Sequence, residues 1–77
     1  MKIDELEKLF IFFFKVKKKN VKKLNMKTFS KWDSLNHIKL ISNIENKYKI
    51  KMTNKEISQA TTFEKIYKVL NKRIKRS

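Results

Sequence analysis

Residues 31–40 read KWDSLNHIKL, and this stretch predicts the start of a helix in the middle of the chain. Asp33 and Ser34 are residue types that favour helix N-termini, because their short side chains accept hydrogen bonds from free backbone amides. Apolar residues then recur every three or four positions, which predicts an amphipathic helix over residues 34–48. The inner side of this helix is expected to carry Leu35, Ile38, Ile41, Ile44 and Tyr48.

Two further helices are predicted on either side of this one. Residues 3–16 carry an apolar stripe at helical spacing, which is typical of an amphipathic helix. Residues 17–32 follow with only scattered apolar side chains, and they are expected to form a long loop that touches the core at intervals. Thr53 and Glu56 have the spacing of a capping box, which opens a short helix over about residues 54–59.

The C-terminal part of the chain predicts one more helix. Thr61 and Glu64 repeat the capping-box spacing and open a helix over about residues 62–75, with its own apolar stripe. No stretch of useful length alternates apolar and polar residues as a strand would. Residues 1–77 are therefore predicted to form a single all-α domain, a small four-helix bundle of three main helices and a short third one.

The composition excludes several kinds of site. The chain has no cysteine and one histidine, so it offers neither a disulfide framework nor the ligand set of a structural zinc site. It has no glycine, which excludes the glycine-rich loops that cradle phosphates. No apolar run approaches the length of about 18 residues that a membrane span needs, and no signal peptide is recognisable, so a cytoplasmic protein is expected.

Positive charge dominates the surface residues. The chain has 21 Lys and Arg against 7 Asp and Glu, a net charge of +14, which favours polyanions or acidic protein surfaces as partners. A small basic helical protein that binds nucleic acid or another polyanion is therefore one hypothesis. Against nucleic acid, the lysine-rich stretch of residues 15–23 is not interleaved with the aromatic side chains on which bases stack.

Self-contained serine catalysis is not favoured. Ser34 and His37 are three residues apart on one predicted helix, so their side chains could meet. A nucleophile and a base also need an orienting group and an oxyanion site, and a bundle of 77 residues offers no evident cleft for them. A non-catalytic protein is expected, with His37 as an exposed helix residue or one that lines a surface used by a partner.

From Phe29 to Leu70 the chain resembles the acyl carrier protein family, almost without gaps. The family hallmark is Asp-Ser-Leu at the start of the second helix, followed by an apolar stripe, an I-E-x-x-[FY] segment and a later T-T-apolar start to the last helix. The matching residues here are Asp33-Ser34-Leu35, Ile44-Glu45-Asn46-Lys47-Tyr48 and Thr61-Thr62-Phe63. Residues 1–28 match in pattern alone, as an amphipathic helix and a long loop.

The resemblance implies a prosthetic group on Ser34. This serine would carry 4′-phosphopantetheine through a phosphodiester, added by a phosphopantetheinyl transferase that uses coenzyme A and magnesium. The thiol of that arm would hold an acyl, aminoacyl or hydroxyacyl group as a thioester and present it to acyl-loading, modifying and acyl-transfer enzymes. The resemblance further implies that Asp33 helps the transferase and its metal to engage the serine, that Leu35 anchors the motif to the core, and that the protein is a monomer.

The resemblance also implies a shelter for the cargo and a surface for partner enzymes. The acyl-chain pocket would be bordered by Ile38, Ile41, Ile44, Ile57 and Ala60. The docking face would comprise Asn36, Lys39, Asn43, Asn46 and Lys47, where family members usually present acidic residues.

The missing acidic residues predict unusual partners. Like charges across an interface repel, so the chain is expected to serve partners with a less basic or an acidic docking face rather than the housekeeping fatty-acid synthase. The W-D-S-L form of the motif is similar to that of stand-alone carriers in pathways for secondary metabolites or for modification of surface polysaccharides.

Overall fold

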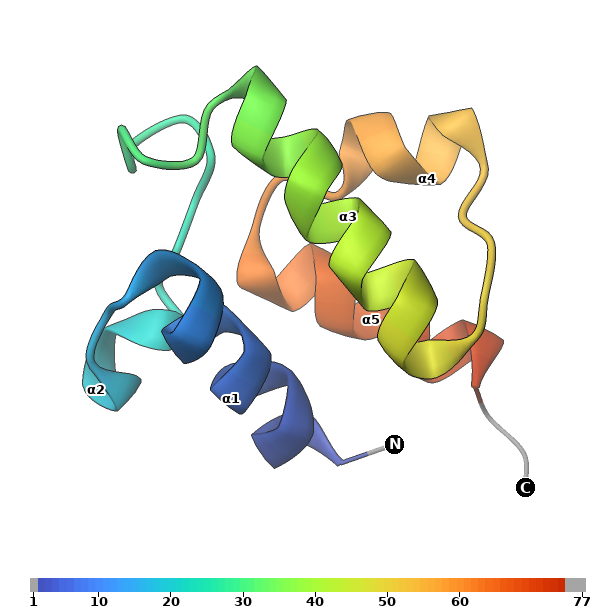
Figure 1. The fold of residues 1–77 in the computed structure, drawn as a ribbon, viewed down its shortest axis with the longest axis horizontal. Coiled ribbons are helices and arrows are strands. Elements are labelled where there is room, and N and C mark those ends of the chain that lie inside the picture. The colour runs from blue at the N-terminus through green and yellow to red at the C-terminus, as the bar shows by residue number, and fades with distance from the viewer. Residues whose placement is uncertain (1, 75–77) are drawn as a thin grey trace.

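The computed structural model describes residues 2–74, which fold into five helices (Figure 1). These are α1 (Ile3–Phe14), α2 (Lys18–Val21), α3 (Ser34–Tyr48), α4 (Asn54–Gln59) and α5 (Phe63–Arg73). Residues 2–74 contain no strand, and an isolated bridge joins Asn25 to Thr62. The predicted all-α class is confirmed. None of these helices has both the length and the hydropathy that crossing a membrane requires.

The three longer helices, α1, α3 and α5, are packed at different angles around the interior. In Figure 1, α1 and α3 run diagonally in roughly opposite directions, and α5 lies behind α3. The short α4 lies close to the first turns of α3, and α2 follows directly on the end of α1. The beginning of α3 is therefore placed between the loop of residues 22–33 on one side and α4 on the other.

The first helix is shorter than predicted because of the backbone at Lys15. The predicted helix of residues 3–16 ends at Phe14, where Lys15 takes a left-handed conformation (φ 56°) and its amide donates to the Ile11 carbonyl at 2.8 Å. This conformation favours glycine, and a residue with a Cβ atom adopts it at a cost of about 1–2 kcal/mol. The predicted loop of residues 17–32 contains the one-turn helix α2, which the scattered apolar residues did not indicate.

The predicted bounds of α3 and α4 are confirmed, and so is the capping box of α4. The Thr53 hydroxyl accepts from the Glu56 amide at 3.1 Å, and the Glu56 carboxylate accepts from the Thr53 amide at 2.9 Å. The same carboxylate binds the Arg73 guanidinium at 2.6 Å, which connects α4 to α5. These hydrogen bonds, with that from the Thr53 amide foremost, lower the pKa of Glu56 below its usual value.

The last helix begins one residue later than the sequence indicated. Thr62 caps α5 by accepting from the Lys65 amide at 3.0 Å, so the capping box predicted from Thr61 to Glu64 is wrong. The reason is a tertiary contact: the Thr61 carbonyl accepts from the Met26 amide at 2.8 Å, which keeps this segment extended against the long loop. Position 75, the predicted end of the helix, lies outside the described residues.

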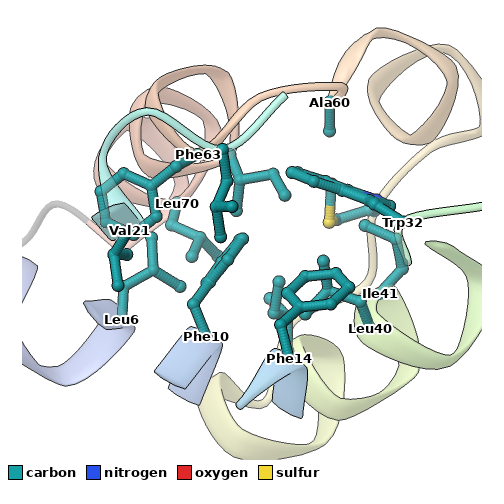
Figure 2. Close-up of a cluster of buried hydrophobic side chains, with 14 residues drawn as sticks. Leu6, Phe10, Phe14, Val21, Trp32, Leu40, Ile41, Ala60, Phe63 and Leu70 are labelled. Atoms are coloured by element: carbon teal, nitrogen blue, oxygen red, sulfur yellow. The ribbon is translucent and has the colours of Figure 1, made fainter. Parts of the chain in front are cut away.

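Aromatic side chains form the centre of the core (Figure 2). Phe10 of α1 meets Trp32 and Phe63 edge to face, with ring centroids 5.7 and 5.0 Å apart, and Phe14 lies 5.4 Å from Trp32. Such pairs stabilise a core by about 0.5–1.5 kcal/mol beyond the area that they bury. The core thus ties α1 and α5 to the segment just before α3. Aliphatic side chains complete it, including Leu6, Val21, Leu40, Ile41, Ile44, Ile66 and Leu70.

The inner face of α3 differs from the predicted one. His37 and Leu40 are buried beside Ile41 and Ile44, whereas Leu35 and Ile38 are 64% and 57% exposed. The prediction that Leu35 and Ile38 face the core is therefore wrong. The helix is rotated about its axis relative to the prediction, because His37 finds hydrogen-bond partners in the interior and can be buried at little cost.

Candidate functional site at the start of α3

Ser34 is the first residue of α3, and it is exposed. Asp33 precedes it as the N-cap, with an extended backbone (φ −95°, ψ −175°). One carboxylate oxygen of Asp33 accepts from the Asn36 amide at 2.8 Å, and the Asp33 carbonyl accepts from the His37 amide at 2.8 Å. The predicted cap is confirmed, and it places the serine hydroxyl at the accessible end of a regular helix.

A second set of hydrogen bonds fixes the chain just before the serine. The Asn36 side-chain amide donates to the Lys31 carbonyl at 2.8 Å, and the Trp32 amide donates to the Phe29 carbonyl at 2.9 Å. The loop therefore enters α3 along a defined path. Trp32 is at the same time 1% exposed within the aromatic core, so this path is anchored by packing as well as by hydrogen bonds.

A buried histidine connects this loop, α3 and α4. The Trp32 indole Nε1 donates to His37 Nδ1 at 3.0 Å, and His37 Nε2 lies 2.8 Å from the Ile57 carbonyl. Because Nδ1 accepts and the carbonyl can only accept, the imidazole is neutral with its proton on Nε2. His37 is 6% exposed, so the prediction of an exposed histidine is wrong. The sequence analysis did not predict the hydrogen bond between Trp32 and His37. The pattern that could have indicated it is a tryptophan directly before the N-cap and a histidine one helical turn after the N-cap.

The same observation removes His37 from any reaction at Ser34. Both ring nitrogens are engaged in the interior, while the serine side chain is on the solvent side. A general base needs a nitrogen within reach of the hydroxyl proton that it accepts. The two residues are neighbours in the helix but belong to opposite environments.

The surface around Ser34 is partly apolar. Ser34 and Ile38 lie one turn apart on the helix, as do Leu35 and Lys39, so these four side chains form two adjacent rows. Leu35 and Ile38 are both more than half exposed. The prediction that Leu35 anchors the motif to the core is therefore wrong, and that part is taken by Trp32 and His37.

The structure does not gather the five predicted pocket residues around a hollow. Ile41, Ile44 and Ala60 are core residues that are at most 3% exposed, Ile57 is half-buried, and Ile38 faces solvent. Five hollows of about 280 to 560 Å³ open on the surface of residues 2–74. The predicted pocket residues do not line any of these hollows. A space for the cargo between these side chains stays a prediction, and it would need the core around α3 and α4 to open.

Most of the predicted docking residues lie on the solvent side of α3. Lys39, Asn43, Asn46 and Lys47 are exposed, and the half-buried Asn36 holds the Lys31 carbonyl. The one acidic residue of this helix, Glu45, uses its carboxylate to accept from the Met52 amide at 2.8 Å. It therefore shapes the connection from α3 to α4, and the exposed face of α3 has no free carboxylate among the described residues.

No group of three or more His, Asp or Glu side chains that could hold a metal ion occurs in residues 2–74. Comparisons with protein-family models, with curated proteins and with solved structures gave no match to the chain. The site is therefore defined by its own geometry: an exposed serine on a capped helix, held in place by a buried hydrogen-bonded pair and flanked by apolar and basic side chains.

Proposed function

We propose that this protein is a non-catalytic acyl carrier that holds its cargo on 4′-phosphopantetheine attached to Ser34. The observation that carries the proposal is the position of this serine, exposed as the first residue of α3 and directly after the capping Asp33. The motif resemblance of Phe29–Leu70 to acyl carrier proteins gives that position its chemical meaning. When bound, the group supplies a thiol that this chain, which lacks cysteine, does not have.

The residues around Ser34 fit a phosphodiester. The N-terminus of a helix carries partial positive charge, which favours an attached phosphate by about 0.3–1 kcal/mol at an exposed site. Lys31, three residues before the serine in the chain, is exposed and adds a positive charge to the segment that leads into α3. One oxygen of the Asp33 carboxylate is directed at the Asn36 amide, which fixes this side chain as the cap.

A carrier needs a serine on a rigid support and an approach that a partner enzyme can use. Asp33, Asn36 and the pair of Trp32 and His37 supply the support. The exposed Leu35 and Ile38 supply an apolar approach beside the serine, which suits recognition by an enzyme surface. All chemistry on the cargo would then belong to the partner enzymes, since His37 is not available to Ser34.

The finer fold assignment is part of the same proposal. The four predicted helices correspond to α1, α3, α4 and α5, and α2 is a single turn within the long loop. This order of three longer helices with a short one before the last agrees with a bundle like that of acyl carrier proteins. The basic surface supports a specialised pathway, with partners whose docking face is less basic than that of the housekeeping fatty-acid synthase enzymes.

Intact-mass measurement tests the proposal. The purified protein is incubated with coenzyme A, magnesium and each of several broad-specificity phosphopantetheinyl transferases. We expect the protein to gain the mass of one phosphopantetheine, and the gain to vanish in Ser34→Ala. Ser42→Ala is the matched control, because Ser42 is an exposed serine two turns further along the same helix.

Two results would contradict the proposal. One is a chain that stays unmodified with every transferase, and the other is a gain of mass that persists in Ser34→Ala. If the unmodified chain instead bound nucleic acid with a steeply salt-dependent affinity, the polyanion-binding alternative would replace the carrier.

A further inference from the structure

A hollow of about 390 Å³ lies between the end of α1 and the start of α3. It is formed by residues from three separate parts of the chain: Phe13, Phe14, Lys15, Lys31, Asn36 and Lys39. We call these six residues the basic hollow. Lysines contribute half of them, and none is acidic.

The floor of the basic hollow is aromatic and firmly packed. Phe14 is 3% exposed, and its ring centroid lies 5.3 Å from that of Phe29 and 5.4 Å from that of Trp32. Phe13 is half-buried and meets Phe14 edge to face at 4.9 Å. An apolar group that entered the hollow would therefore meet a preformed surface, and little conformational entropy would be lost on binding.

The rim of the basic hollow carries positive charge that the described chain does not neutralise. Lys15, Lys31 and Lys39 are all exposed. The ion pairs found in residues 2–74 lie elsewhere and join Lys22 to Glu7 and Arg73 to Glu56. Three cations around one recess hold a potential that attracts a carboxylate and raises its rate of encounter.

The positions of the rim lysines are set by the backbone. Lys15 is the left-handed residue that ends α1, and the Lys31 carbonyl is held by the Asn36 side chain at 2.8 Å. Lys39 lies one turn after Leu35 on α3. The three lysine side chains therefore start from fixed backbone points around the aromatic floor.

The basic hollow adjoins the surface next to Ser34. Leu35 follows Ser34 directly, is 64% exposed, and shares a helix row with Lys39 of the rim. A partner that covers Leu35 to reach the serine therefore also meets Lys39. Lys39 lies five residues after Ser34, about 7.5 Å along the axis of α3 and about 140° around it, and Leu35 lies between the two on the helix surface.

We propose that the basic hollow is the docking site for an acidic segment of the enzyme that acts on the carrier. An Asp or Glu of the partner would bind among the three lysines, and a neighbouring aromatic or aliphatic side chain would rest on the half-buried Phe13. This reverses the usual charges of carrier recognition and identifies the partner by its chemistry, as a protein with carboxylates beside its active-site entrance. The inference rests on the proposed function for its meaning, but the binding itself does not require a modified Ser34.

The first experiment uses one phosphopantetheinyl transferase in two forms, one with basic residues around its active-site entrance and one with those residues replaced by Glu. The ratio of loading rates (kcat/KM) is measured for the wild-type carrier and for the double variant Lys31→Glu/Lys39→Glu. We expect the wild type to favour the acidic form and the variant to favour the basic form, with a change in the ratio of about tenfold or more. The matched control, Lys51→Glu/Lys55→Glu, changes the net charge equally at exposed sites outside the basic hollow and is expected to leave the preference unchanged.

The second experiment does not depend on loading. A blocked peptide of alternating Glu and Phe is titrated into the ¹⁵N-labelled protein, next to a peptide with Gln in place of Glu. We expect the Glu peptide to shift the amide signals of the basic hollow and the Trp32 indole signal, and to bind about tenfold more weakly to Lys31→Glu/Lys39→Glu.

The outcomes separate the two proposals. If no transferase loads Ser34 but the Glu peptide binds in the basic hollow, the carrier function fails and the docking site stands. If loading succeeds without a change of preference, or if the peptide shifts all exposed lysines alike, the docking site fails and the carrier function stands. Tighter binding of a single-stranded oligonucleotide or of anionic lipid vesicles to the same residues would overturn the acidic-protein partner.

Discussion

The two ends of α3 are stabilised in different ways. At the beginning, Asp33 caps the helix, and His37 has a hydrogen-bond partner at each ring nitrogen. At the end, the buried Tyr48 hydroxyl has no hydrogen-bond partner among residues 2–74, and Lys49 leaves the helix in the left-handed conformation (φ 57°). Among residues 2–74, the buried polar side chain at the end that carries Ser34 is fully paired, whereas the far end leaves one buried hydroxyl unpaired.

The difference shows which part of the helix the fold holds most specifically. A buried polar group with all its partners fixes one arrangement, whereas an unpaired one costs stability without fixing anything. Burial, and secondarily the negative charge of Glu5, raises the pKa of Tyr48 to about 12, so its hydroxyl stays protonated. The far end of α3 tolerates this cost, and the near end contains no comparable defect among the described side chains.

Removing the histidine at the near end has the largest expected effect. His37→Leu leaves the buried Trp32 indole N–H without a partner, which costs about 1–3 kcal/mol, and it leaves the Ile57 carbonyl with the Ala60 amide alone, at 3.3 Å. We expect the free energy of unfolding in urea to fall by about 2 kcal/mol or more. The exposed Leu35, changed to Gln, is the control and should shift it by less than about 0.5 kcal/mol. Equal effects of the two variants would show that the buried pair contributes nothing specific.

The cap of the near end comes next. Asp33→Ala removes the acceptor of the Asn36 amide and is expected to lower stability by about 1 kcal/mol, whereas Asp33→Asn keeps an acceptor and is expected to retain it. Measuring the rate of phosphopantetheine loading for both variants separates two functions of Asp33. A slow but fully stable Asn variant would mean that the carboxylate charge serves the transferase, and a normal rate would limit Asp33 to capping.

The far end should respond with the opposite sign. Tyr48→Phe removes the unpaired hydroxyl and keeps the ring, so we expect stability to rise by about 1 kcal/mol near neutral pH. The pKa of Tyr48 is raised from the usual 10.0 to about 12 in the folded protein. The ionisation of Tyr48 therefore leaves the free energy of unfolding unchanged below pH 10 and lowers it as the pH rises toward 12, where only the unfolded chain loses the proton readily. The advantage of the Phe variant should therefore grow across that range in pH-dependent urea unfolding. A constant difference from pH 9 to 12 would contradict this, and Tyr67→Phe serves as the control.

The smallest effect concerns the left-handed end of the helix. Lys49→Gly relieves a cost of about 1–2 kcal/mol but adds about 0.5–1 kcal/mol of backbone entropy in the unfolded chain, so a net gain of about 0.5 kcal/mol is expected. Lys15→Gly should give a similar gain in thermal unfolding, because its φ is nearly the same. Only the change at Lys15 should also weaken binding of the acidic peptide, since Lys15 lines the basic hollow and Lys49 does not. A loss of stability in both would mean that lysine is favoured there for another reason.

Local signals in the sequence predicted the helices well. The Asp33 cap and the capping box of Thr53 and Glu56 gave the correct starts of α3 and α4, because the hydrogen bonds involved span only three residues. The start of α5 was missed by one residue, since the Thr61 carbonyl is taken by Met26, a contact that no local pattern records. The ending of α1 was missed because lysine stands where glycine usually signals a helix end.

The rotation of α3 could not be predicted from hydropathy. A hydropathy scale ranks Leu35 and Ile38 as more apolar than His37 and therefore predicts that they face the core. In the structure His37 is buried instead, because its imidazole has hydrogen-bond partners 5 and 20 residues away in sequence. The candidate serine was predicted because its signal is a contiguous triplet. The basic hollow was not predicted, because its three lysines come from separate segments of the chain that only the folded structure brings together.

The hydrogen bond between Trp32 and His37 makes the intrinsic tryptophan fluorescence of this protein sensitive to its structure near Ser34. Trp32 is the only tryptophan, it lies two positions before Ser34, and its indole N–H is bonded to an imidazole that itself contacts α4. Indole emission responds to such neighbours, so the fluorescence of the unlabelled protein reads the contact between α3 and α4. A change in the contact between α3 and α4 would therefore be followed in real time without a dye.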